Sequence, residues 1–205
     1  MVAYPKQAKE LVQLLEEDQA EKRAVGAAFF HTQDKAELEA QRAVLPEKTR
    51  QRSVRMLEIL KQIGEPSISS IGSEGAQAVS VLAVHDSINT LRQILRAFTL
   101  LYERDRNDTY YQAIPTMTDR LLLLERKPQL YGTQWMFDEH KQPFLPTVQD
   151  FEHVNERRAE YGIDPLRWPK SLAIPESEQP WLKWPLSELV MRTPTNAEYQ
   201  DFAQG

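Results

Sequence analysis

Residues 76–84 read Ala-Gln-Ala-Val-Ser-Val-Leu-Ala-Val, a run that is apolar on nearly every side of a helix. A helix without a polar face is suited to the centre of a core rather than to its surface. Ser73 precedes the run as a candidate N-cap, and the helical pattern continues to about Glu103. The sequence therefore predicts a long, central, buried helix at 73–103.

Further helical segments precede this one, separated from it by a predicted loop at 67–72. Leucines at helical spacing mark the first of them, and Asp18 falls on its apolar stripe. Pro46 and Gly64 are expected to end the second and the third. The predicted helices lie at 6–23, 34–44 and 47–63.

After the central helix, the spacing of apolar residues changes along the chain. A helix is expected to run to about Glu125, and Gln129 to Phe137 then alternates between polar and apolar residues. A turn at 138–140 and a return strand would complete a hairpin at about 129–145. Thr147 and Asp150 resemble a capping box, which would open a last helix ended by Gly162.

The fold class predicted from these segments is mainly α. We expect a single helical domain at 1–163, built around the central buried helix and carrying the small β-hairpin. Residues 164–205 contain six of the 13 prolines and three of the four tryptophans, namely Trp168, Trp181 and Trp184. This composition favours a C-terminal arm that packs on the domain, closes over it, or joins two copies in a homodimer.

Composition excludes several classes of function. The chain has 205 residues, a net charge of -5 with both signs interspersed, and no cysteine. It therefore lacks a strongly basic nucleic-acid-binding surface, a disulfide frame and thiolate chemistry. No apolar run approaches the roughly 20 residues that span a bilayer. We expect a cytoplasmic protein that binds neither nucleic acid nor membrane.

Charged side chains lie on or beside apolar faces at several positions. Asp18 shares a face with leucines, Asp119 and Arg120 precede four leucines, and Arg158 shares a face with Val154. One interpretation is a buried salt-bridge network that sets helix packing. The other is a cleft in which arginines hold an anionic or carbonyl-bearing ligand. By contrast, the cluster of Arg50, Arg52 and Arg55 is expected on a solvated helix face.

His85 is expected in the buried central helix, where most histidines are satisfied core residues. If it lines a cavity, its near-neutral pKa makes it the best general acid or base in the chain. Neither a cofactor nor a metal is expected, because phosphate-loop, dinucleotide, serine-hydrolase and zinc-protease motifs are absent. His153 and Glu156 have metal-site spacing, but no second such pair accompanies them.

Several of these features, taken in order, resemble the uncharacterised bacterial domain-of-unknown-function family 6624. The resemblance covers about Lys6 to Leu166. It rests on Asp18-Gln19 with Arg23, Gly64-x-Pro66, Ile71-Gly72, His85-Asp86, Asp119-Arg120, Gln129-x-Tyr131-Gly132-Thr133-Gln134, Val154-Asn155-Glu156-Arg157-Arg158 and Tyr161-Gly162-Ile163. The family brings no assigned activity, but it implies that the polar residues of these motifs belong together.

Two hypotheses follow. The first is an enzyme that acts on a small polar or acyl/peptide-like substrate, possibly in biosynthetic tailoring. Its candidate catalytic residues are His85, Asp119 and Asp18, and its candidate substrate-binding residues are Arg120, Gln129, Tyr131, Gln134 and Arg158. The alternative is a non-catalytic interaction or immunity-type module in which these charges are structural. A concave pocket with His85 in reach of Asp18 or Asp119 would favour the enzyme.

Overall fold

The computed structural model describes residues 2–31, 35–137 and 143–167. These residues are mainly helical, which confirms the predicted fold class. They fall into two compact units, of which the first ends at Ala113 and the second begins at Ile114. The domain boundary predicted at 163/164 stays a prediction, and the tryptophans of the expected arm lie outside the described residues.

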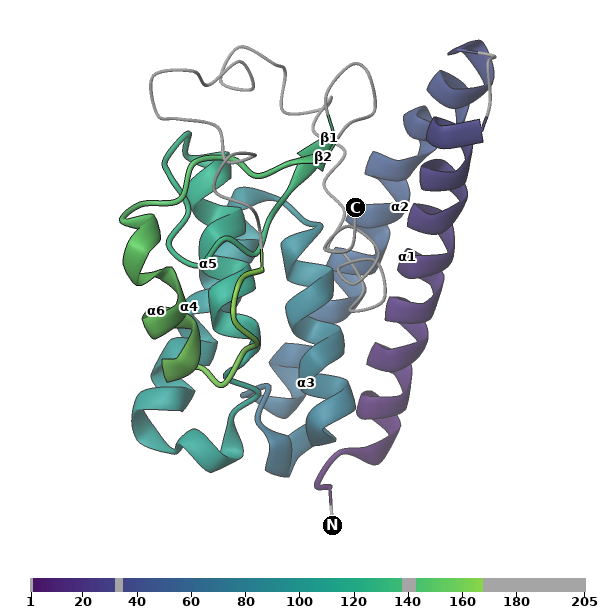
Figure 1. Ribbon diagram of the computed structural model, residues 1–205. Coiled ribbons are helices and arrows are strands. Elements are labelled where there is room, and N and C mark those ends of the chain that lie inside the picture. Colours follow the sequence, from purple (N-terminus) through teal and green to yellow (C-terminus); the bar gives the residue numbers. More distant parts are fainter. Residues whose placement is uncertain (1, 32–34, 138–142, 168–205) are drawn as a thin grey trace. The chain divides into compact units, whose positions relative to one another are not determined.

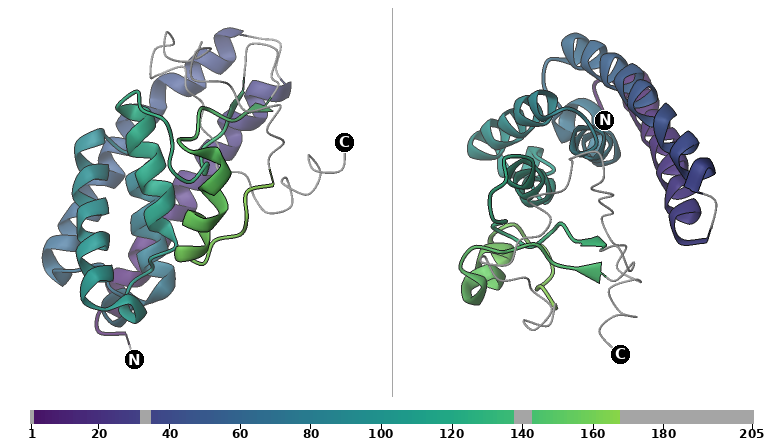
Figure 2. Two further views of the ribbon diagram at one scale, coloured as in Figure 1. Left: turned by 60° about the vertical axis from the view of Figure 1, so that its left-hand side comes forward. Right: turned by 90° about the horizontal axis from the view of Figure 1, so that it is seen from above.

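In its described residues, the first unit contains four α-helices and a short 3-10 helix. In chain order they are α1 (Pro5–His31), α2 (Lys35–Ile63), α3 (Ile68–Val84), α4 (Ile88–Arg104) and η1 (Arg106–Asp108). α1 packs against both α2 and α3, and α4 packs against α3 (Figure 1). Seen from above, α1 and α2 run alongside each other (Figure 2).

Helical spacing explains which side chains these helices bury. Leu11, Asp18 and Val25 follow one another at intervals of seven residues on α1, and all three are buried. Seven residues make nearly two turns, so the three side chains share one face. The prediction that Asp18 lies on an apolar stripe is confirmed.

The two helices expected at 34–44 and 47–63 are a single helix, so the stop predicted at Pro46 is wrong. α2 continues through Pro46. A proline removes one backbone N–H from the helix, and the remaining hydrogen bonds of a 29-residue helix maintain it on both sides of that position. As a result one continuous helix faces α1.

The single long helix expected at 73–103 is two helices. α3 starts earlier, with Ser67 as its N-cap, bends at Gly72 (φ 73°) and ends at Val84 with His85 as its C-cap. Ser87 then caps α4 by accepting a hydrogen bond from the Thr90 N–H (3.2 Å). A cap that satisfies the first donors of a new helix favours a break at this point. The expectation that His85 lies inside a buried helix is therefore wrong.

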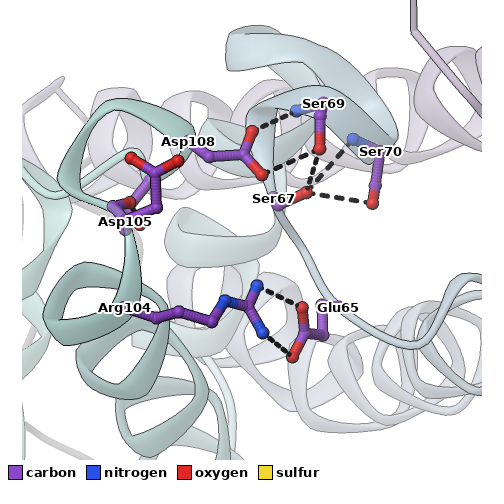
Figure 3. Close-up of polar contacts among 8 residues, drawn as sticks. Glu65, Ser67, Ser69, Ser70, Arg104, Asp105 and Asp108 are labelled. Carbon is purple, nitrogen blue, oxygen red and sulfur yellow. Dashed lines mark hydrogen bonds and ion pairs between the residues drawn. The ribbon is translucent and has the colours of Figure 1, made fainter.

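Polar contacts join the start of α3 to the end of α4 (Figure 3). Asp108 accepts hydrogen bonds from the backbone N–H of Ser69 (2.6 Å) and from its hydroxyl (2.8 Å). Arg104 forms a two-pronged ion pair with Glu65. These contacts fix the two helices at the end opposite to His85, because Ile68 begins α3 and Val84 ends it.

The second unit contains α5 (Ala113–Leu124), β1 (Met136–Phe137), β2 (Pro143–Phe144), η2 (Phe151–His153) and α6 (Val154–Glu160). Its core is formed by Trp135, Leu145, Val148, Val154 and Leu166. The two strands are antiparallel, with Met136 opposite Phe144. The predicted hairpin thus has only two residues in each strand, and the turn expected at 138–140 lies outside the described residues.

Two local expectations for this unit are wrong. Residues 129–135 do not form a strand, because Gln129 makes only an isolated bridge with Val148 before the chain turns at Gly132 (φ 62°). The helix that the expected capping box would open does not begin at Thr147 either. Asp150 adopts a left-handed conformation without a side-chain cap bond, and α6 begins only at Val154.

Candidate functional site

Asp18 and His85 form a hydrogen-bonded pair in the first unit. The distance from His85 Nδ1 to Asp18 Oδ2 is 2.5 Å. The Asp18 side chain is 1% exposed and that of His85 is 15% exposed. Asp18 reaches this position from the buried face of α1, and His85 reaches it from the turn between α3 and α4. The geometry therefore couples a buried carboxylate to an imidazole that solvent can reach.

Arg52 holds the other side of the Asp18 carboxylate. Its Nη2 lies 3.2 Å from Asp18 Oδ1, and its Nη1 donates to Glu21 (2.8 Å). Lys48 also binds Glu21 (3.0 Å). Arg52 is buried because it shares a face of α2 with Met56 and Ile59, four and seven residues further on. The expectation of a solvated helix face is wrong for Arg52.

The pKa of Asp18 is lowered from its ordinary value of 3.8 by these neighbours. Burial alone raises the pKa of a carboxyl group, because it disfavours the charged form. Here the hydrogen bond to His85 and the charges of His85, Lys22 and Arg52 outweigh burial. Asp18 is therefore ionised at neutral pH and acts as a hydrogen-bond acceptor for His85 Nδ1.

A cleft of about 530 Å³ opens beside this pair. Its volume falls within the range of roughly 300–1,000 Å³ that is typical of small-molecule sites. Lys22 contributes from α1, and the turn between α3 and α4 contributes His85 and Asp86. The full lining consists of Lys22, Leu45, Pro46, Thr49, Arg50, Ser53, Val54, His85, Asp86, Ser87 and Thr90.

Asp119 lies in the second unit, and its environment differs from that of Asp18. Its side chain is fully buried on α5. Oδ1 accepts from the backbone N–H groups of Leu130 (2.8 Å) and Tyr131 (3.0 Å). Oδ2 accepts from the N–H and the hydroxyl of Thr133, both at 2.8 Å. Burial raises the pKa of Asp119, against the opposing effect of these donors. One carboxylate thus holds the loop at 130–133 in place.

Gln129 holds the next part of the same loop. Its side-chain amide donates to the carbonyl oxygens of Gln134 (2.8 Å) and Pro146 (3.2 Å), and its side-chain oxygen accepts from the Gln134 N–H (2.8 Å). The side chain of Gln134 is also buried, with two long contacts to Thr133. Gln129 and Gln134, which are predicted to bind a substrate, therefore form hydrogen bonds within the loop itself.

Two arginines of α6 also form hydrogen bonds with the loop. Arg158 donates to the carbonyl oxygens of Tyr131 (2.7 Å) and Asp164 (2.6 Å), and its burial confirms that it points inward. Arg157 donates to the carbonyl oxygens of Leu130 (2.8 Å) and Gln149 (2.6 Å). Both guanidinium groups therefore bind backbone carbonyls of their own unit.

Arg120 and Tyr131 are the two predicted site residues of this unit that are only partly buried. Burial lowers the pKa of Arg120 to about 10. Burial, together with the neighbouring Tyr161, raises the pKa of Tyr131. The rings of Tyr131 and Tyr161 meet edge to face, with centroids 5.5 Å apart.

The predicted site residues thus fall into two groups. The first unit brings Asp18 and His85 together. The second brings Asp119, Gln129, Tyr131, Gln134 and Arg158 together around one loop, and Arg120 lies beside Asp119 on α5. A single site that joins both groups stays a prediction.

Two residues beside Asp18 and His85, namely Arg52 and Asp86, are not among the predicted catalytic or substrate-binding residues. Arg52 is signalled by its spacing from Met56 and Ile59, which places it on the buried face of α2. Asp86 is signalled by Ser87, since an N-cap at Ser87 ends the preceding helix and leaves Asp86 in the turn beside His85.

Within the part of the chain that the structure describes, no cluster of three or more potential metal-binding side chains occurs. His153 Nδ1 binds Asp150 at 2.8 Å instead. None of the helices in the described ranges combines the length and the apolar character needed to cross a bilayer.

Comparison with known proteins supplies a family but no relative of known activity. No curated protein and no solved structure matches the chain. A family model described as a family of unknown function, DUF6624, matches residues 5–172. The match spans the helices of both units and all of the predicted site residues. The chain belongs to this family of unknown function, DUF6624.

Proposed function

We propose that the protein is an enzyme that uses His85 as a general acid and base on a small polar or acyl/peptide-like substrate. One observation carries the proposal: His85 lines a cleft of about 530 Å³ while its Nδ1 binds the buried carboxylate of Asp18 at 2.5 Å. A reaction in biosynthetic tailoring, in the bacterial cytoplasm, is the setting we propose for it.

The chemistry follows from the pair. An ionised carboxylate accepts a hydrogen bond, so Asp18 keeps a proton on Nδ1 of His85. The other ring nitrogen, Nε2, then exchanges protons with a substrate. The negative charge of Asp18 stabilises the imidazolium that forms when Nε2 takes up a proton. Asp18 is in this scheme a positioning residue, and Arg52 in turn fixes Asp18.

The residues of the second unit enter the proposal with different roles. Asp119, Gln129, Gln134 and Arg158 would shape the loop at 129–134, because their hydrogen bonds are made to that loop. The substrate-binding role predicted for Arg120 and Tyr131 stays a prediction. Shaping the loop is a different role from the catalytic one that the sequence predicts for Asp119.

Turnover by matched variants tests the proposal. Wild type, His85→Gln, Asp18→Asn and the control Lys61→Met, an exposed residue in the last turn of α2, are incubated with a panel of small esters, amides and dipeptides. Products are followed by mass spectrometry and folding by circular dichroism. We expect at least one compound to be converted, with a loss of about 100-fold or more in His85→Gln.

Asp18→Asn should lose less activity than His85→Gln, because it disturbs the imidazole without removing it. Lys61→Met should match wild type. Conversion by His85→Gln at the wild-type rate, or no conversion of any compound on the panel, would contradict the proposal.

A non-catalytic interaction module is the second candidate. It is supported by the chain of ion pairs from Asp18 through Arg52 and Glu21 to Lys48, which joins α1 to α2. If these charges serve packing alone, Asp18→Asn and Arg52→Met lower stability while every compound on the panel stays unconverted by wild type as well.

A further inference from the structure

One wall of the cleft is a face of α2. Six of the lining residues come from this helix, and they form two rows in which each member is four residues from the next. Residues four apart lie above one another on a helix, so the two adjacent rows share one face. One row contains Leu45, Thr49 and Ser53, and the other contains Pro46, Arg50 and Val54.

Apolar side chains of this wall are open to the cleft. Val54 is 46% exposed, Pro46 is exposed, and Leu45 is partly exposed. A single exposed valine is ordinary at a protein surface, whereas three apolar residues that line one cleft form a patch that a ligand can cover. Contact with such a patch is favourable for apolar groups, because it removes their surface from water.

Arg50, the charged residue of this wall, is held by its own helix. Its Nε and Nη2 donate to the Glu47 carboxylate (2.9 and 2.8 Å). An arginine whose guanidinium is held in this way leaves its hydrocarbon stem to the surface around it. The cleft therefore combines an apolar face on α2 with ionisable side chains from other elements, namely Lys22, His85 and Asp86.

We propose that this wall of α2 binds the apolar chain of an acyl substrate whose carbonyl group reaches His85. The inference rests on the proposed function and narrows its substrate class to acyl compounds with an apolar chain. The apolar residues and His85 line one cleft of about 530 Å³, a volume that suits a substrate with a chain as well as a reacting group. Leu45 and Val54 are in this role specificity-determining residues.

A series of neutral amides tests the proposal by binding. Acetamide, butanamide and hexanamide differ only in the length of the chain, and δ-hydroxyvaleramide has the length of hexanamide but ends in a hydroxyl group. The imidazole signal of His85 reports binding in proton NMR titrations, and it is assigned with His85→Gln among only four histidines. Each buried methylene group strengthens binding about fourfold, so hexanamide should bind at least about tenfold more tightly than acetamide. It should also bind more tightly than δ-hydroxyvaleramide.

Two valines of α2 provide a matched pair of variants. Val54 lines the cleft, whereas Val44 is 51% exposed and lies outside the lining. Val54→Asp should weaken hexanamide binding about tenfold or more, because the chain would remove water from a carboxylate, and should change acetamide binding little. Val44→Asp adds the same charge to the same helix and should leave both affinities unchanged. Leu45→Ser tests the other row and should also weaken hexanamide binding, and circular dichroism checks that each variant folds.

Three results would overturn this inference: no saturable shift of the His85 signal with hexanamide, an affinity that does not depend on chain length, or equal effects of Val54→Asp and Val44→Asp. These failures are distinguishable from failure of the proposed function. Conversion of polar compounds that depends on His85, without any dependence of binding on chain length, removes only the apolar wall. Binding that depends on chain length, without conversion of any compound, removes only the catalysis.

Discussion

Asp18 and Asp119 are both buried carboxylates, yet their surroundings differ in kind. Asp119 has four donors, and all of them belong to one loop of its own unit. Asp18 binds two ionisable side chains, Arg52 and His85, and His85 lines a cleft. A carboxylate saturated by loop donors holds a backbone conformation. A carboxylate bound to an imidazole beside a cleft is suited to proton transfer.

This difference distinguishes a structural role from a catalytic role, which the sequence alone does not distinguish for these two carboxylates. Both Asp18 and Asp119 are charged residues beside apolar ones in the sequence. The groups that bind each carboxylate distinguish a structural from a catalytic role, because only an ionisable and accessible partner can exchange a proton with a ligand. Burial of a charge is by itself weak evidence for a catalytic role.

The largest effect is expected from Asp119→Asn. The new amide NH₂ faces donors of the loop, so two buried donors lose their acceptor. We expect the free energy of unfolding to fall by about 4 kcal/mol, at about 2 kcal/mol for each unsatisfied group. Chemical denaturation measures it, and Asp164→Asn, at an exposed position, is the control. A loss no larger than that of the control would place Asp119 outside the framework of the loop.

Asp18→Asn should have a smaller effect, of about 2 kcal/mol at neutral pH, because the amide keeps part of the contact with His85 and Arg52. The pKa of Asp18 is lowered in the folded state from 3.8. Its contribution to stability is therefore present above about pH 3.8 and is lost as the pH falls through the lowered value.

The difference in unfolding free energy between wild type and Asp18→Asn should accordingly shrink in acid. Denaturation curves of both proteins at neutral pH and below pH 3.8 measure it. A difference that stays constant over this range would show that the ionised carboxylate of Asp18 contributes no stability.

Gly132→Ala tests the conformation of the loop that Asp119 holds. Gly132 has a φ of +62°, a conformation that costs other residues about 1–2 kcal/mol, and a Cβ there would lie 2.8 Å from Leu166 Cδ2. We expect a loss of that size in unfolding free energy. Gly26→Ala is the matched control, because no atom outside the helix lies within 4 Å of the added Cβ. Alanine in that helix should stabilise slightly. Equal effects at both glycines would contradict the account of the loop.

The smallest effect concerns His153 at the surface. The hydrogen bond and the charge of Asp150 raise the pKa of His153 from 6.5. NMR titration should show this raised value, and Asp150→Asn should return it toward 6.5. Because the folded pKa is raised, any contribution to stability is present below pH 6.5 and is lost as the pH rises through the folded value. A titration of His153 that Asp150→Asn leaves unchanged would contradict the pairing.

Much of the helical fold and part of the site follow from the sequence. Spacing alone places Asp18 with Leu11 and Val25, and Arg158 with Val154, on buried faces. The same reasoning applied to Arg52, Met56 and Ile59 would have identified Arg52. Ser87 is harder to interpret, because an N-cap inside a long helical pattern competes with continuation of the helix, and packing decides between them. The donors to Asp119 depend on how a short loop folds back over α5, which no local pattern encodes.

The pairing of Asp18 with His85 is tested most directly by nitrogen-15 NMR of the imidazole. At neutral pH, wild type should carry a proton on Nδ1, with a far-downfield Nδ1–H signal that reflects the short bond to Asp18. Asp18→Asn should move that signal upfield, because an amide oxygen is a weaker acceptor than a carboxylate. A neutral His85 that carries its only proton on Nε2, or an Nδ1–H signal unchanged in Asp18→Asn, would contradict the acid–base pair.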